Sequence, residues 1–568
     1  MEIKKQIAEE VAKFYGVDAE TAKKTVVQSK KGMGDYSSTI AFMLAKRLGK
    51  NPSEIAGEFK TKNKLFEKVE AVNGYINFYL SERYYEKVVK ERMKKRKKIK
   101  KKIIVEFPSV NPNKPWHVGH LRNALLGNSV ANIYAYLGYN VEKIDYIDDL
   151  GLQFAQSLYS YLKLNKRIEG KIDHWLGKEY VKIAKLVEED KSVESEVRDV
   201  LTKMERGTIE EARWLAEECV KAQYETSFKF NIFHDALIFE SDIMHNIFEK
   251  GVEMLKRSNA LEYCEEGKNA GCYVFRSSEG EKVLIRSDGT ATYTGKDVIF
   301  ALWKFGKISG IKFEKFIKQP NGKTAYKSSR TGREMKFGHA DVVINVIGIE
   351  QVFPQKVIKE ILSRFGIEEY HHLGYAHVRL KEERFSGRKG IWVGYTADEL
   401  FEEGMKRVME KTMDKKIVKE IVNSAIKFAF LKMHSTKEVV FDWERALSTE
   451  GDSGPYLLYS YVRAKNILNK VKRMPKDDGY RYNEDEREII KMLTNFDEVV
   501  ENSAKNFDPH TIADYLLELS KLFHSFYAKY RVLQAEKGKL KRILLVKKFA
   551  EILKTGLNLL GIGTVEKM

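Results

Sequence analysis

The stretch IIVEFPSVNPNKPWHVGHLRNALLGN, residues 103–128, decides the fold because a strand pattern leads through a loop into a helix pattern. Residues 103–107 are apolar enough for a buried strand, and the helical pattern runs from Val118 to Leu137, where Gly138 can end it. NVEKIDYIDD, which follows, has the pattern of a second strand. A strand, a helix and another strand in this order predict a parallel α/β domain.

Two histidines, His117 and His120, stand at the start of this helix with Gly119 between them. Zinc-binding histidines on a helix are usually four residues apart with a nearby acid, so the three-residue spacing disfavours a metal site. A helix N-terminus has unpaired N–H groups and a partial positive charge that suit a phosphate, and imidazoles can donate to phosphate oxygens. Gly119, which has no Cβ, lets a nucleotide approach the backbone. We favour this phosphate site, although two packed helix histidines remain an alternative.

The length of 568 residues predicts about three or four domains, and the formal net charge of +19 favours a polyanionic partner such as nucleic acid. A lysine-rich solvated surface explains that charge equally well. The only cysteines are Cys219, Cys264 and Cys272, without a CxxC pair, so we expect no structural zinc and a reducing, cytoplasmic location. The N-terminus has no signal-peptide pattern and no apolar run is long enough to span a bilayer, so we expect no membrane association.

The patterns along the chain change several times, and we predict four regions from these changes. The basic run KERMKKRKKIKKK, residues 90–102, fits a solvated linker better than a strip that binds a nucleic-acid backbone. The polar, basic residues 310–338 predict an extended loop or a hairpin. The predicted regions are mixed helix and strand at 1–95, an α/β domain at 101–395 with a helical insertion at about 160–260, a helical region at 396–450 and an all-helical domain at 451–568.

The histidine pattern resembles the HxGH signature of class I aminoacyl-tRNA synthetases and related nucleotidylyltransferases. The second half of that signature is a KMSKS-type loop after a late strand, and ERFSGRKG, residues 383–390, follows the strand pattern HVRL. Arg384 stands in place of the first lysine and Phe385 in place of the methionine, whereas Ser386, Arg388 and Lys389 keep the pattern. A flexible basic loop can close over a triphosphate and neutralise departing pyrophosphate.

A longer resemblance covers the whole chain. Residues 105–154, from VEFPSV to DLGLQF, look like arginyl-tRNA synthetases, and so do DGTATYTGKDV, GPYLLYSYVRA and the N-terminal GDYSSTIAFMLAK. The resemblance implies a Rossmann-like parallel-sheet catalytic domain with a helical insertion, an α+β N-terminal tRNA-binding domain and an all-α C-terminal anticodon-binding domain. It also implies that 396–450 is a linker that contacts the tRNA stem.

The resemblance places an arginine site around Tyr293 and Asp297, which share one face of a predicted helix. On residues alone this is a common surface pair, but an aspartate can grip a guanidinium with two hydrogen bonds, which an ammonium cannot match. In arginyl-tRNA synthetases the matching tyrosine and aspartate hold the guanidinium. Gln351 lies farther along the chain from Asp297 than the family pattern suggests. The remaining arginine-binding residues that the resemblance implies are Glu106, Ser109, Asn111, His117 and Gln351.

The resemblance also implies ATP, L-arginine and tRNA(Arg) as partners of a monomer, with Mg²⁺ accompanying ATP. ATP would contact His117, Gly119, His120, Arg384, Ser386 and Lys389, with His117, His120, Arg388 and Lys389 as catalytic residues. Near the anticodon it places Tyr456, Tyr459, Tyr527 and Met568, although tyrosines at helical spacing are also common in cores. Three rival functions stay open: another class I synthetase, a small-molecule nucleotidylyltransferase and an inactive RNA-binding paralogue.

Overall fold

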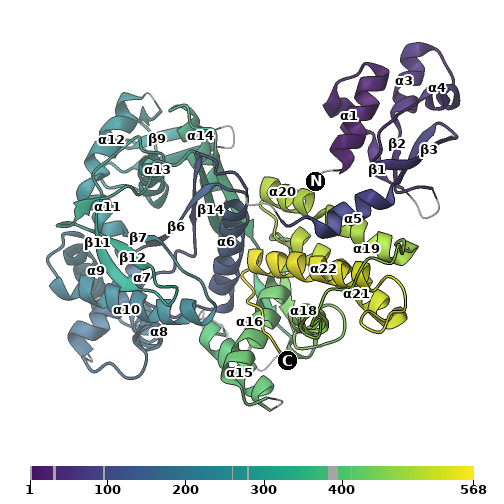
Figure 1. The fold of residues 1–568 in the computed structure, drawn as a ribbon. Coiled ribbons are helices and arrows are strands. Elements are labelled where there is room, and N and C mark those ends of the chain that lie inside the picture. Colours follow the sequence, from purple (N-terminus) through teal and green to yellow (C-terminus); the bar gives the residue numbers. More distant parts are fainter. Residues whose placement is uncertain are drawn as a thin grey trace.

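A computed structural model describes residues 3–29, 33–93, 96–164, 166–258, 260–277, 280–381, 395–410 and 412–568. Figure 1 shows three parts: a central sheet with helices around it, an all-helical part that ends at the C-terminus, and a small N-terminal part that stands against those helices. This is the α/β class predicted from the sequence, with an α+β part before it and an all-α part after it.

The N-terminal part is a four-stranded antiparallel sheet in the order β1-β2-β4-β3, with helices packed on it. Gly49 ends α3 as its C-cap with a left-handed backbone, at φ 63°. Its elements are α1 (Ile3–Tyr15), α2 (Ala19–Lys24), β1 (Val26–Gln28), β2 (Tyr36–Ser38), α3 (Ile40–Leu48), α4 (Pro52–Glu58), β3 (Phe66–Val72), β4 (Tyr75–Leu80) and α5 (Glu82–Lys90).

The central sheet has eight strands in the order β13-β11-β12-β7-β6-β5-β14-β15. From β12 to β15 all neighbours are parallel, so the carboxyl ends of these strands lie at one edge. The strands are β5 (Lys102–Glu106), β6 (Asn140–Ile147), β7 (Ala236–Phe239), β11 (Lys312–Lys318), β12 (Thr324–Ser329), β13 (Arg333–Glu334), β14 (Val342–Gly348) and β15 (Tyr370–Tyr375).

The decisive stretch folds as predicted, because β5 is followed by a loop and by α6 (Val118–Tyr136). Ile103, Ile104 and Val105 are fully buried in the middle of the sheet. In an open parallel sheet, ligands bind in the crevice at the carboxyl ends of the strands. The start of α6 lies at that edge, so the fold brings the histidine pair to the usual place for a ligand.

Two predictions about the middle of the chain need refinement. The helical insertion between β6 and β7 consists of α7 (Leu152–Tyr159), a π-helix (Ser160–Leu164), α8 (Ile172–Glu189), α9 (Lys191–Glu205) and α10 (Glu210–Lys229). It therefore ends near residue 229 and not near 260, since β7 is a strand of the central sheet. Residues 312–329 form a hairpin, β11 with β12, that extends the same sheet by pairing with β7.

The chain between β7 and β15 adds helices and a small three-stranded sheet beside the main one. Its elements are α11 (Glu240–Asn246), α12 (Phe248–Arg257), β8 (Glu262–Tyr263), β9 (Tyr273–Ser277), β10 (Gly280–Ile285), α13 (Tyr293–Lys304), a 3-10 turn (Ile349–Gln351) and α14 (Val352–Ser363). The helix α13 follows β10 directly and packs against it. This arrangement carries Tyr293 and Asp297 on a helix, as predicted.

From residue 395 onward the chain is mostly helical, and its last helices pack against both other parts. Lys491 forms an ion pair with Asp35 at 3.4 Å, and Lys541 forms one with Glu82 at 2.7 Å, so the N-terminal part is held by the C-terminal helices. No described helix is both long and apolar enough to cross a membrane. The elements are α15 (Ala397–Met409), α16 (Lys415–Leu431), β17 (Val439–Phe441), α17 (Trp443–Ala446), α18 (Gly454–Asn469), α19 (Glu484–Thr494), α20 (Phe496–Asn506), α21 (His510–Lys529) and α22 (Lys539–Leu559). The strand β17 pairs in parallel with β16 (Val378–Leu380), which precedes this part of the chain.

Candidate active site

The two histidines form the N-terminal cap of α6. His117 is the N-cap residue, and its Nδ1 accepts hydrogen bonds from the N–H groups of Gly119, at 3.0 Å, and His120, at 3.3 Å. In return, Nδ1 of His120 accepts from the N–H of His117 at 3.3 Å. Because both Nδ1 atoms accept, each neutral ring carries its proton on Nε2. The Nε2–H groups are therefore donors that the cap does not use.

Both imidazoles are neutral at physiological pH. Burial lowers the pKa of His117 to about 4, and the ammonium of Lys114 adds to the effect. Burial and the neighbouring His117 ring also lower the pKa of His120 well below its ordinary value. The rings stack with their centroids 3.5 Å apart, which would bring two positive charges together if both were protonated. The pair can thus offer two neutral N–H donors to an oxyanion, without a change of charge.

Gly119 is required by the histidine cap itself. A Cβ at this position would lie 2.8 Å from Cε1 of His117, so any side chain would push the imidazole away from the helix start. The sequence suggested that the missing Cβ lets a nucleotide approach the backbone. In the structure the imidazole of His117 fills that side of Gly119, so the missing Cβ makes room for the cap.

The acidic residues gather at the same edge of the sheet, and Asp297 stands out among them. Glu106 forms a buried ion pair with Lys304, which neutralises it. Within the part of the chain that the structure describes, the Asp297 carboxylate has neither an ion-pair nor a hydrogen-bond partner. Burial, followed by the carboxylate of Glu106, raises the pKa of Asp297 to about 7. A cation bound here would find a carboxylate without a counter-charge.

Tyr293 begins α13, and its side chain is 64% exposed. Its ring faces the ammonium of Lys296 at 5.7 Å, and Lys296 in turn forms an ion pair with the buried Glu240. The predicted pair of Tyr293 and Asp297 therefore sits one helical turn apart at the N-terminal end of α13, beside further acids. The tyrosine is exposed to solvent and the aspartate is partly buried. A ligand that enters from the solvent can therefore pass the tyrosine and reach the aspartate.

The sequence interpretation missed three acids that follow strands at the same edge: Asp148 and Asp149 after β6, and Glu240 after β7. Asp148 comes after β6, and burial together with the carboxylate of Glu240 raises its pKa to about 7. Burial raises the pKa of Asp149 to about 6, although Ser241 donates to it through both its N–H, at 2.9 Å, and its hydroxyl, at 2.6 Å. Acids directly after a parallel strand, as in DYIDD, are the signal that could have found them.

The other predicted arginine-binding residues occupy loops at this edge. Ser109 has a positive φ of 56°, and its N–H donates to the Asp145 carboxylate at 3.1 Å. The backbone carbonyl of Asn111 accepts from the side chain of Gln223 at 3.0 Å. Gln351 is exposed at the end of the short turn after β14, and β14 pairs with β5. All three thus follow the carboxyl ends of neighbouring strands.

The predicted phosphate loop lies outside the described residues, and with it Arg384, Ser386, Arg388 and Lys389. The described residues on either side are hydrogen-bonded. On the N-terminal side, the N–H of Lys381 donates to the carbonyl of Phe441 at 3.0 Å. On the C-terminal side, the carbonyl of Tyr395 accepts from the N–H of Val118 at 3.0 Å, next to His117. The chain therefore returns from this loop at the histidine cap.

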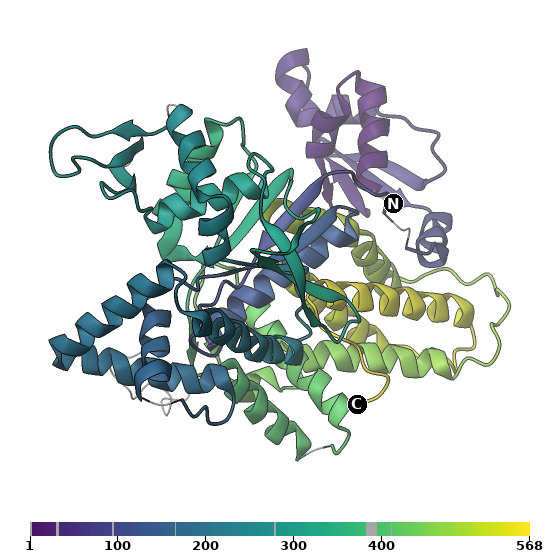
Figure 2. The same cartoon turned by 90° about the vertical axis from the view of Figure 1, so that its left-hand side faces the viewer.

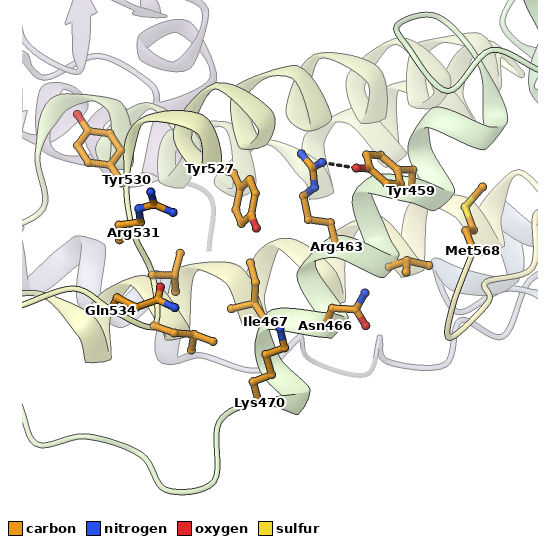
Figure 3. Close-up of a pocket in the computed structure, with 13 residues that line it drawn as sticks. Tyr459, Arg463, Asn466, Ile467, Lys470, Tyr527, Tyr530, Arg531, Gln534 and Met568 are labelled. Carbon is orange, nitrogen blue, oxygen red and sulfur yellow. Dashed lines mark hydrogen bonds between the residues drawn. The ribbon is translucent and has the colours of Figure 1, made fainter.

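Three of the four residues predicted near the anticodon surround a cavity of about 450 Å³ between α18, α21 and the C-terminus. Figure 3 shows Tyr459, Tyr527 and Met568 around it. Arg463, which the sequence interpretation missed, lies 4.5 Å from the ring of Tyr459 and 4.8 Å from that of Tyr527. Tyr456 is buried beside the cavity and stacks on His524. The cavity combines aromatic faces with a guanidinium, which suits an unstacked base.

Comparison with known families agrees with this site and fold. Residues 85–318 match the family described as tRNA synthetases class I (R), catalytic domain. Residues 1–80 match an arginyl tRNA synthetase N-terminal domain, and residues 457–568 match a DALR anticodon binding domain. Taken with the parallel sheet and the histidine-capped helix, these matches define a class I aminoacyl-tRNA synthetase.

Individual relatives narrow the class. Arginine–tRNA ligase from Thermococcus kodakarensis is 40% identical, with 94% of each chain covered, and that from Deinococcus radiodurans is 35% identical, with 99% of each covered. The solved structure of Thermus thermophilus arginyl-tRNA synthetase superimposes with a TM-score of 0.87 at 32% identity, and the match covers 100% of this chain and 99% of that one. The chain belongs to the arginyl-tRNA synthetase family.

Proposed function

We propose that the protein is an arginine–tRNA ligase that works in two steps. In the first, a carboxylate oxygen of L-arginine attacks the α-phosphorus of ATP, giving arginyl-adenylate and releasing pyrophosphate. In the second, the 2′-hydroxyl of the terminal adenosine of tRNA(Arg) attacks the arginyl carbonyl, and AMP leaves. The substrate carboxylate is the nucleophile of the first step, so the protein has to align the reactants and stabilise charge.

The observation that carries this proposal is the free carboxylate of Asp297 at the same sheet edge as the neutral histidine donors. Asp297 would hold the guanidinium through two hydrogen bonds, with Tyr293 against it and the paired Glu106 behind. Ser109, Asn111, Gln351 and His117 would surround the amino and carboxylate groups of arginine. Since Asp148 carries no ion pair within the described chain, it adds negative charge near the same end.

The histidine end would bind ATP. The Nε2–H groups of His117 and His120 would donate to phosphate oxygens, where negative charge increases as pyrophosphate departs. We assign Arg384, Ser386, Arg388 and Lys389 to the same triphosphate, whose charge Mg²⁺ would help to neutralise. Among them Lys389 and Arg388 would act on the transferring and leaving groups. Arg384 would supply the cation that a lysine provides in the usual signature.

The C-terminal cavity would bind bases of the anticodon loop. Tyr459, Tyr527 and Met568 provide faces for stacking, and the buried Tyr456 stacks on His524, which also stacks on Tyr459. The net charge of +19 suits a partner whose phosphates it neutralises, so tRNA binding should weaken steeply with salt. We further propose that the enzyme acts as a cytoplasmic monomer and forms the adenylate only when tRNA is bound.

The decisive test is charging of total tRNA with each of the twenty labelled amino acids in turn. We expect only arginine to enter acid-precipitable tRNA. Charging with another amino acid would overturn the arginine assignment and favour a different class I synthetase. ATP–pyrophosphate exchange with and without tRNA(Arg) tests the tRNA requirement, and robust exchange without tRNA would refute that part alone.

A further inference from the structure

A buried aspartate outside the substrate site, Asp398, gathers donors from the helical insertion. It is the second residue of α15, and its side chain is 6% exposed. The ammonium groups of Lys171 and Lys229 each lie 2.8 Å from its carboxylate, on different oxygens. Nε2 of His174 lies 2.9 Å from it, and the hydroxyl of Thr226 lies 3.0 Å from both oxygens. One carboxylate thus joins α15 to residues that flank or belong to α8 and α10.

The cluster is an ion network and not a metal site. Asp173, His174 and Asp398 lie close enough together to hold a cation, but Lys171 and Lys229 already provide its positive charge. Burial raises the pKa of Asp398, whereas the hydrogen bond from His174 and the ammonium of Lys171 lower it far more, so the net pKa is well below its ordinary value. Asp398 therefore stays ionised.

The start of α15 is hydrogen-bonded directly to the start of α6. The N–H of Ala397 donates to the carbonyl of Trp116 at 2.8 Å, and the N–H of Val118 donates to the carbonyl of Tyr395 at 3.0 Å. Thr396 forms an isolated antiparallel bridge with His117. Residues 395–397 and 116–118 therefore behave as one short pair of strands, and the histidine cap is part of it. In both views α8, α10 and α15 lie next to one another below the sheet (Figures 1 and 2).

We propose that Asp398 is a positioning residue for ATP: by tying α15 to the insertion helices, it holds residues 395–397 in place and thereby orients His117. The inference rests on the ATP role proposed above for the histidine cap. An ion network of this size next to the cap explains how the start of α6 keeps its Nε2–H donors in one direction. A shift of the cap by about 1 Å is enough to cost up to about 100-fold in rate.

The test compares Asp398→Asn with Asp173→Asn in arginine-dependent ATP–pyrophosphate exchange, with tRNA(Arg) present. Asp173 is a matched control because it is a buried acid of the same network that bonds Lys171 and the N–H of His174 but does not reach α15. For Asp398→Asn we expect kcat/KM for ATP to fall about 30-fold, with KM for arginine changed less than about twofold. For Asp173→Asn we expect kcat/KM for ATP and KM for arginine each to stay within about threefold of the wild-type value.

Two outcomes would overturn the proposal. One is a loss of kcat/KM for arginine in Asp398→Asn that equals the loss of kcat/KM for ATP. The other is a loss in Asp173→Asn as large as the loss in Asp398→Asn. Either result indicates a general structural role. If Asp398→Asn does not fold, Thr226→Val removes one donor at almost constant volume, and we expect the same ATP-selective loss at about fivefold. Wild-type enzyme without any arginine-dependent exchange would instead refute the proposed function, so the two failures are distinguishable.

Discussion

The two ends of the candidate active site are built in opposite ways. At the histidine end the polar groups satisfy one another: His117 and His120 cap α6, and both imidazoles are neutral. At the acidic end the charges are left incomplete, because Asp297 and Asp148 have no cation bonded to them within the described chain. The first end is complete without a ligand, whereas the second lacks a positive charge.

This difference in charge between the two ends indicates how each end can select its ligand. Preformed neutral donors need no rearrangement when charge develops on a phosphate, so they suit a group whose charge changes during the reaction. Buried carboxylates with raised pKa values are costly in the free protein, and a planar cation with a fork of N–H donors relieves that cost. A ligand that lacks the fork leaves the carboxylate unsatisfied, which is a strong basis for discrimination.

The largest effect should come from Asp297→Ala. Because it removes the carboxylate that would grip the guanidinium, we expect kcat/KM for arginine to fall by about 10³-fold while KM for ATP changes little. Charging of tRNA with labelled arginine at varied arginine and ATP measures both. Asp288→Ala is the matched control, since Asp288 is an exposed acid in the turn before α13 and accepts from the N–H of Thr290 at 2.9 Å. An equal rise in KM for ATP would contradict the assignment of Asp297 to arginine binding.

The next effect should come from the histidine end. Asparagine can replace the Nδ1 acceptor of His117 or His120 but cannot reach as far as the Nε2–H donor. We therefore expect His117→Asn and His120→Asn each to lower kcat of ATP–pyrophosphate exchange by about 100-fold, with KM for arginine nearly unchanged. In the wild type the rate should not rise as pH is lowered from 7 to 5. A rise would mean that the charged imidazolium is the active form. It would contradict the claim that the histidine end is neutral.

A smaller effect is a pH dependence that belongs to the acidic end. The raised pKa of Asp297, about 7, means that the folded protein holds a proton there which the unfolded chain loses near its ordinary, lower pKa. The stability from this group is therefore lost as pH rises towards 7, and arginine binding restores it. Between pH 6 and 8 the ionised fraction rises about tenfold, so we expect KM for arginine to fall about tenfold.

Steady-state rates at saturating ATP and tRNA measure this change, and calorimetry in two buffers of different ionisation enthalpy measures the proton released on binding. Glu106 differs from Asp297 in this respect, since its carboxylate is already neutralised by the ammonium of Lys304. A KM for arginine that stays flat from pH 6 to 8 would show that Asp297 is ionised in the free enzyme.

The same contrast explains what could be predicted from the sequence. The histidine end comes from one continuous stretch, and its strand, loop and helix follow from apolar periodicity and from the position of Gly138. The acidic end depends on strand order. Asp148 and Glu240 are far apart in the sequence and meet because β6 and β7 are parallel neighbours. Tyr293 and Asp297 share a helix face that periodicity predicts, but the closeness of Asp297 to Glu106 at the end of β5 does not follow from spacing.

The strand β7 shows the same limit for the fold. Its four residues, ALIF, are all fully buried, so no alternation of polar and apolar side chains distinguishes them from a piece of helix. The pattern therefore places these four residues in the helical insertion. As a result, it does not reveal that Glu240, the next residue, belongs to the acidic end of the site. The hairpin at 312–329 was recognisable from its polar turn, whereas its pairing with β7 depends on a strand that the pattern did not reveal.

The smallest expected effect separates the two jobs of His117, which are capping α6 and donating to phosphate. His117→Ala removes the acceptor for the N–H groups of Gly119 and His120, and loss of such a cap costs about 1 kcal/mol, whereas His117→Asn keeps an acceptor and should cost less. Both variants should lose activity to a similar degree, about 100-fold in kcat, but His117→Ala should unfold at a lower temperature and urea concentration than His117→Asn. Thr292→Ala and Thr292→Asn at the start of α13 are the matched pair, since Thr292 caps that helix through Gly295 at 3.3 Å. Equal stability of His117→Ala and His117→Asn would mean that the cap is held from outside, by residues 395–397, and that the histidine end is not complete by itself.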